Sequence, residues 1–142
     1  MTEVTPMQTD IDSPADSPWS RGAAYLDGAF LPLAEAKLPI TDWGYRRSDV
    51  TYDVVSVWDG QFFRLDDHLS RFRASMNAMR FAPRESDEEI RAILHKLVRL
   101  SRLREAYVAI DCIRGRPAPD QRYHPVMRAA ISPALPSPMC GR

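Results

Sequence analysis

Two neighbouring side chains in the valine-rich segment at residues 50–58 could do chemistry: Tyr52 and Asp53. Successive side chains of a β-strand point to opposite faces, so the two are expected to face in opposite directions. A tyrosine in a pocket wall offers a flat ring and a hydroxyl that donates a hydrogen bond. By its context alone, however, Tyr52 is more simply interpreted as a strand tyrosine packed in the core.

Arg46 and Arg47 precede this segment and add positive charge at its start. They could neutralise the carboxylate of a substrate at the rim of a pocket. They could equally be solvated loop charges paired with Asp42 or Asp49, and exposed pairs of that kind contribute little to stability.

Arg71 is the third candidate, five residues after Asp66 and beside the apolar stripe of a predicted helix. A planar guanidinium suits bidentate binding of a phosphate. The pattern alone favours a plainer interpretation, in which Arg71 is a surface residue or pairs with Asp67 four positions earlier.

Composition narrows the classes of function. The 142 residues carry 19 basic and 19 acidic side chains, so the chain lacks the field that attracts nucleic acids or membrane surfaces. Its two cysteines and three histidines (Cys112, Cys140, His68, His95 and His124) have neither disulfide-framework nor metal-ligand spacing. We interpret the histidines as structural or surface residues. No signal peptide and no membrane-length apolar run are evident, so a cytoplasmic protein without a metal site is expected.

Four sequence signals predict the elements that must position these residues. Asp27-Gly28 and Asp59-Gly60 lie between apolar segments and indicate two β-hairpins. Asp66 is expected to cap one helix, and the Ser86…Glu89 pair forms the capping box of a second. With a further strand in "REAYVAIDCIRG", the pattern predicts an α+β fold, an antiparallel sheet of hairpins with two helices.

The two ends of the chain differ from this patterned region, which spans residues 21–115. Residues 1–20 are acidic and rich in proline, which is typical of a disordered arm. Residues 116–142 contain six prolines and neither helical nor strand periodicity, so we interpret them as a divergent tail outside the fold. A truncated gene or a shifted reading frame would produce such an ending and would leave one sheet edge uncovered.

Three segments in one register resemble a known family: "AYLDGAFLPL", "ITDWGYRRSDVTYDVVSVWDGQFFRLDDHLSRF" and "LREAYVAIDCIRG". Together they resemble the N-terminal small domain of the class IV, or fold-type IV, aminotransferases, which depend on pyridoxal phosphate. That family includes branched-chain and D-amino-acid aminotransferases and aminodeoxychorismate lyase. The motif "SDVTYDVVSVWDG" is most similar to that of the (R)-selective amine transaminases.

The resemblance implies roles for particular residues. Arg71 matches the arginine that grips the cofactor phosphate, and Tyr52 matches a tyrosine that lines the substrate pocket. Arg47 stands where amine-specific members commonly have histidine or tyrosine, which suggests a substrate that bears a carboxylate. Arg114 matches a family arginine of less defined role.

The same resemblance implies that part of the active site is not in these residues. The Schiff-base lysine of the family comes from a second domain, and neither Lys37 nor Lys96 matches it. We therefore expect a homodimeric full-length enzyme that moves an amino group from an amine or amino acid to a 2-oxo acid, and no activity from these residues alone. The alternatives are a non-catalytic dimerisation module that pairs with a full-length relative, and a fragment of a family lyase.

Overall fold

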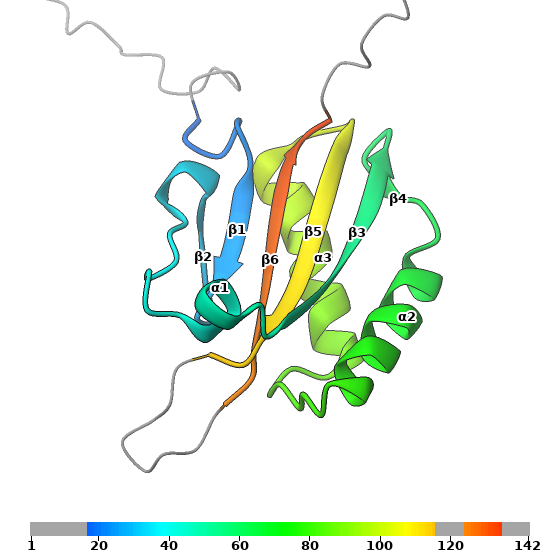
Figure 1. Ribbon diagram of the computed structural model, residues 1–142. Coiled ribbons are helices and arrows are strands. Elements are labelled where there is room, and N and C mark those ends of the chain that lie inside the picture. The colour runs from blue at the N-terminus through cyan, green and yellow to red at the C-terminus, as the bar shows by residue number, and fades with distance from the viewer. Residues whose placement is uncertain (1–16, 116–123, 135–142) are drawn as a thin grey trace, which may run out of the picture.

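The computed structural model describes residues 17–115 and 124–134, which form one antiparallel sheet with two long helices on one face (Figure 1). The strand order is β2-β1-β6-β5-β3-β4. The predicted α+β architecture is confirmed. In chain order the elements are β1 (Ala23–Leu26), β2 (Ala29–Pro32), the short 3-10 helix η1 (Leu33–Glu35), α1 (Trp43–Arg47), β3 (Val50–Trp58), β4 (Gln61–Phe62), α2 (Leu65–Ala78), α3 (Asp87–Ser101), β5 (Ala106–Ile113) and β6 (Val126–Pro133).

Both predicted hairpins are present, one joining β1 to β2 and the other joining β3 to β4. Asp27 and Gly28 have φ values of 50° and 81°, and Asp59 and Gly60 have 50° and 74°. Two consecutive positive φ values are the mark of the tight turn whose twist matches that of paired strands, and Asp-Gly adopts it with little strain.

The two long helices begin in different ways. The predicted capping box of α3 is confirmed, because the Ser86 hydroxyl accepts from the Glu89 N–H while the Glu89 carboxylate accepts from the Ser86 N–H. The predicted cap of α2 is wrong: the helix follows Arg64, which is left-handed at φ 54°, and Asp66 lies inside the first turn. An acidic side chain there still interacts favourably with the positive end of the helix dipole.

The core lies between the sheet and α2 and α3. Alternate residues of the three longest strands face the helices and are fully buried, among them Val55 and Val57 of β3, Val108 and Ile110 of β5, and Met127 and Ile131 of β6. The helices contribute Leu69, Phe72, Met76, Ile90, Leu94 and Leu97. The period-2 and period-3.6 patterns therefore meet in one apolar layer.

Strand β6 corrects the prediction of an unpatterned tail from residue 116. It pairs with β1 on one side and with β5 on the other, so it is a central strand rather than a missing one. Met127, Ala129 and Ile131 face the helices, while Arg128 and Ala130 face away. Residues 116–123 and 135–142, and residues 1–16 of the predicted arm, lie outside the described part of the chain.

Among the described residues, no long helix covers the second face of the sheet. Exposed apolar side chains lie on it, including Tyr52 and Val54 of β3 and Tyr107 of β5. The loop that leads to α1 reaches this face at β6, where Asp42 pairs with Arg128 (Figure 1). We call this surface the open face. Within the described residues, no helix has the length and apolar character needed to cross a membrane.

Candidate functional site

Asp53 joins β3 to α2 through two side chains of that helix. Arg71 donates from Nε to Asp53 Oδ2 and from Nη2 to Oδ1, each over 2.8 Å. The His68 Nδ1 lies 2.8 Å from the same Oδ1, where a carboxylate accepts its proton. Asp53 also accepts from the Val54 N–H over 2.7 Å. Four donors therefore converge on one buried carboxylate, which is only 5% exposed.

These contacts keep Asp53 ionised. Burial alone raises the pKa of the Asp53 carboxyl, but the hydrogen bonds from Arg71, His68 and the Val54 N–H outweigh it and leave the pKa below its usual value. The hydrogen bond and charge of Asp53 in turn raise the pKa of Arg71. The ionised Asp53 carboxylate therefore holds the Arg71 guanidinium in one orientation.

Arg71 has one guanidinium nitrogen, Nη1, without a partner in the described part of the chain. Its side chain is 67% exposed, and Nε and Nη2 make its contacts with Asp53 and His68. Nη1 remains available to an oxygen of a phosphate or carboxylate, in an orientation that Asp53 sets. The pairing with Asp67 that the sequence favours is wrong, because Asp67 pairs with Arg64 at 2.6 Å.

Tyr52 lies on the other side of β3, on the open face, and is 71% exposed. Its interpretation as a core tyrosine is therefore wrong. Tyr52 and Arg71 flank β3 from opposite faces, and β4 pairs only with Val57 and Trp58 at the far end of β3. In the described part of the chain, the outer edge of β3 beside Tyr52 and Asp53 thus has no strand partner. Tyr52 and Arg71 are both exposed, whereas Asp53 is buried.

The arginines at the start of β3 are arranged differently from the sequence prediction. The Arg47 guanidinium lies 3.7 Å from the centre of the Trp43 ring, a cation–π contact within α1. The carboxylates expected to pair with Arg46 or Arg47 are taken by others, since Asp42 binds Arg128 and Asp49 binds Arg114.

Arg114, just after β5, contacts two other parts of the fold. It donates from Nε to Asp49 Oδ2 over 2.9 Å and from Nη2 to the Met79 carbonyl over 3.2 Å. Its guanidinium also lies 4.4 Å from the centre of the Phe81 ring. Arg114 therefore connects β5, the start of β3 and the end of α2.

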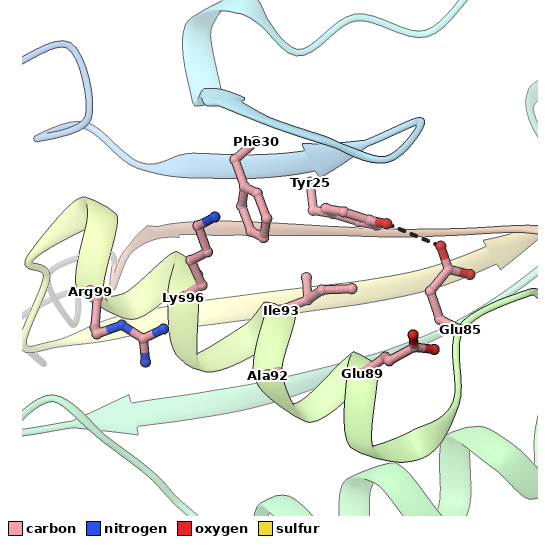
Figure 2. A pocket seen from close by; sticks show the side chains of 8 residues that line it. All are labelled: Tyr25, Phe30, Glu85, Glu89, Ala92, Ile93, Lys96 and Arg99. Carbon is pink, nitrogen blue, oxygen red and sulfur yellow. Dashed lines mark hydrogen bonds between the residues drawn. The ribbon is translucent and has the colours of Figure 1, made fainter.

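The two lysines lie away from Arg71. Lys96 borders a hollow of about 370 Å³ between α3 and the β1–β2 hairpin, with its ammonium 4.2 Å from the centre of the Phe30 ring (Figure 2). At the other end of this hollow the Tyr25 hydroxyl donates to Glu85 over 3.1 Å. Lys37 lies on the open face beside β1 and β6. Two strands, β6 and β5, lie between β1, which Lys37 adjoins, and β3, which carries Asp53. At about 4.8 Å per strand spacing, β1 and β3 are about 14 Å apart.

His68 is the site residue that sequence reasoning missed. The sequence favours a structural or surface role, but His68 contacts Asp53 and lies 3.2 Å from Arg71. The available signal is its spacing three residues before Arg71, which places both on one side of a helix. Within the described residues, no cluster of three or more histidine, cysteine or acidic side chains could hold a metal ion.

Comparison with known proteins identifies the family. The sequence profile of the class IV amino-transferases matches residues 51–138. A D-alanine aminotransferase of Staphylococcus aureus (strain MSSA476) is 29% identical over 111 residues, which are 78% of this chain and 38% of that enzyme. One of Listeria monocytogenes (serotype 4b, strain F2365) is 35% identical over 81 residues, 57% of this chain and 28% of that enzyme.

A solved structure agrees on the fold. The branched-chain aminotransferase from the thermophilic archaeon Thermoproteus uzoniensis, solved with norvaline, superposes with a TM-score of 0.68 at 21% identity, over 80% of this chain and 41% of that one. The chain spans about two fifths of the length of the Staphylococcus aureus enzyme.

Proposed function

Because the chain belongs to the class IV aminotransferases, a family that depends on pyridoxal phosphate, we propose that it supplies the phosphate-binding arginine of such a site. One observation carries this: Arg71 is held by two hydrogen bonds to Asp53, which His68 also contacts, and Nη1 has no partner among the described residues. The residues fit the group, because an exposed, oriented guanidinium is what a phosphate requires. When bound, the cofactor supplies the electron sink for chemistry at the substrate carbon.

The other proposed roles follow from position. Tyr52 forms a wall of the substrate pocket from the open face, next to the outer edge of β3. Arg47 receives a substrate carboxylate at the rim. In the full-length protein, an amino group moves from an amine or amino acid to a 2-oxo acid, and two copies form a homodimer. A cytoplasmic location belongs to the same proposal.

We also propose that these 142 residues do not catalyse transamination alone. That reaction needs a lysine amine to hold the cofactor and to move a proton. Lys96 lies on α3 against Phe30 of β2, and Lys37 lies on the opposite face of the sheet from Arg71. Neither lysine contacts Arg71, Asp53 or His68, which supports a Schiff-base lysine from outside these residues.

The phosphate role predicts a large difference between two arginine variants. Pyridoxine 5'-phosphate, which has no aldehyde and cannot react with lysine, is titrated into the chain and followed by ligand fluorescence. Arg71→Gln is expected to weaken binding by about tenfold or more, because it removes a charge-assisted hydrogen bond. Arg64→Gln, an exposed arginine just before the same helix, is the matched control and should bind as the parent does. Equal binding by Arg71→Gln and the parent refutes the role.

If these residues alone have no Schiff-base lysine, borohydride reduction should not trap pyridoxal phosphate on a single lysine. Pyridoxal phosphate and borohydride are added to the purified chain, and intact mass is measured. We expect no stoichiometric adduct on one lysine and no conversion of an added amine. A single adduct at Lys37 or Lys96 together with turnover would show that the short chain has a working site of its own.

The exposed apolar side chains of the open face favour a second candidate, a non-catalytic module that pairs with a full-length relative. The arginine titration separates the two proposals. A module of this kind needs no phosphate binding, so Arg71→Gln and the parent would then bind the ligand equally poorly.

A further inference from the structure

The hollow of about 370 Å³ between α3 and the β1–β2 hairpin is a groove with an apolar floor (Figure 2). Tyr25 of β1 and Phe30 of β2 form one wall, and their ring centres are 5.2 Å apart. Ala92 and Ile93 of α3 form the other wall. The groove lies on the β1 side of the sheet, whereas Arg71 is bound to β3, so the two are separate surfaces. We call this hollow the α3–hairpin groove.

The two ends of the groove carry opposite charges, and only the acidic end is already paired. The Glu85 carboxylate accepts from the Tyr25 hydroxyl over 3.1 Å, and the Glu89 carboxylate accepts from a backbone N–H at the start of α3 over 2.8 Å. At the other end, Lys96 and Arg99 have no carboxylate partner among residues 17–115 and 124–134. An occupant that completes the groove therefore has to be apolar in the middle and negative at the basic end.

The chain divides its charge unequally between its first residues and the rest. Residues 1–16 carry four acidic side chains and no lysine or arginine. Residues 17–142 therefore carry all 19 basic side chains but only 15 of the 19 acidic ones. The neutral chain thus combines an acidic segment with a basic remainder, and blocks of opposite charge attract each other.

Residues 1–16 join the described fold at the end of the sheet where the basic end of the groove lies. Strands β1 and β5 both run antiparallel to β6, so they begin at the same end of the sheet. Helix α3 ends at Ser101, shortly before β5, and its last turn is therefore at that end as well (Figure 1). Residues 17–22 lead into β1 from there, and Trp19 among them packs against the core.

The segment is long enough to reach the groove. Lys96 and Arg99 lie in the last part of α3, within about 8 Å of its end at about 1.5 Å per residue. From Ser17 back to Asp12, an extended chain spans up to about 17 Å. Asp12 and the residues before it can therefore lie beside the basic end without any change in the described fold.

The sequence of the segment matches the lining of the groove. The triplet Asp10-Ile11-Asp12 places an aliphatic side chain between two carboxylates. The groove offers the complement, two cations beside an apolar floor. A small inorganic anion would pair with the cations but leave the floor uncovered. A purely apolar ligand would leave the cations without a partner.

We propose that residues 1–16 of this chain bind in the α3–hairpin groove. The carboxylates of Asp10 and Asp12 pair with the basic end, and Ile11 packs on the apolar floor. The bound segment ties the β1–β2 hairpin to α3 from outside the sheet. The contact involves neither Arg71 nor a cofactor, so it goes beyond the proposed aminotransferase role and stands independently of it.

Backbone ¹⁵N relaxation of the isotope-labelled full chain at low salt tests this. We expect amide order parameters above about 0.7 in residues 8–13, whereas values below about 0.6 mark a flexible backbone. Lys96→Glu combined with Arg99→Glu should lower them below about 0.6, because the carboxylates are then repelled. Adding Asp10→Lys and Asp12→Lys to that variant should restore them, because every charge of the contact is then reversed.

Arg80→Glu combined with Arg84→Glu is the matched control. It changes the net charge by the same amount at two exposed arginines, which lie between the end of α2 and the start of α3. The order parameters of residues 8–13 should stay at the parent value. Values below about 0.6 in the parent, or equal losses in both double variants, overturn the proposal.

Two further measurements need no charge-reversed variant. Raising the salt from about 0.02 M to about 0.5 M should lower the order parameters of residues 8–13, because the contact is between exposed charges. Their amide shifts should not change over a tenfold dilution, because binding within one chain does not depend on concentration. Shifts that move on dilution would assign the groove to the segment of a second copy and overturn the contact within one chain. Arg71→Gln should change none of these results, which separates them from the phosphate role.

Discussion

Asp111→Asn is expected to raise the free energy of unfolding by about 3 kcal/mol at pH 8 and to change it little at pH 4. Burial is the largest cause of the rise in the Asp111 pKa from 3.8 to about 6. Each tenfold change in an acid constant is worth about 1.4 kcal/mol, which sets the size of the effect.

The sign follows from proton linkage. Between pH 3.8 and about 6 the folded chain keeps the Asp111 proton that the unfolded chain has lost, so stability falls as the pH rises through that window. Above it, the ionised buried carboxylate costs a constant amount. Asparagine cannot ionise, so the difference between variant and parent should grow from pH 4 and level off near pH 7.

Urea unfolding at several pH values, followed by circular dichroism, measures this difference. Asp49→Asn is the matched control, because Asp49 pairs with Arg114 at 2.9 Å and its loss should lower stability slightly rather than raise it. If Asp111→Asn is less stable than the parent at pH 8, the attraction between Asp111 and Arg128 outweighs the cost of burial.

Ile131→Ala is expected to lower the free energy of unfolding by about 2–5 kcal/mol, the usual cost of truncating a fully buried isoleucine. Ile131 is 0% exposed and lies in register between Val108 of β5 and Ala23 of β1. Small domains have total stabilities of about 5–15 kcal/mol, so the loss is a large share of the whole.

Ser132→Ala provides a control from the neighbouring position, because Ser132 faces the open side of the sheet. Its midpoint in urea should stay near that of the parent, while that of Ile131→Ala falls. Equal midpoints for both variants would mean that residues 126–133 do not pack in the sheet. The prediction of a tail outside the fold would then be right.

The elements that could be predicted are those with local chemistry. Asp27-Gly28 and Asp59-Gly60 specify tight turns by their own backbone preferences, and Ser86 with Glu89 specifies a helix start within four residues. Strand β6 could not be recognised in this way. Pro125 and Pro133 bound this short strand and give it the look of a proline-rich tail, and the carboxylate that pairs with its outward-facing Arg128, Asp42, is 86 positions away in sequence.

The same limit applies to the candidate site. The family resemblance implies that Arg71 is a phosphate ligand. The carboxylate that orients Arg71, however, cannot be predicted from the spacing of residues along one helix. The bond from Arg71 to Asp53 joins residues 18 positions apart on different elements. In the sequence, Asp53 stands out only as a polar residue in an apolar strand, and packing against α2 gives that anomaly its explanation.

The central place of β6 has a consequence for how the chain folds as it is synthesised. The β1–β2 hairpin is made well before β6, but it joins the rest of the described sheet by pairing with β6. Ala23 must wait for Ile131, 108 positions later, before that pairing closes. Contacts so distant in sequence form slowly. During translation the β1–β2 hairpin therefore lacks its partner in the sheet until β6 has been made, which leaves its strand edge open to pairing with other chains.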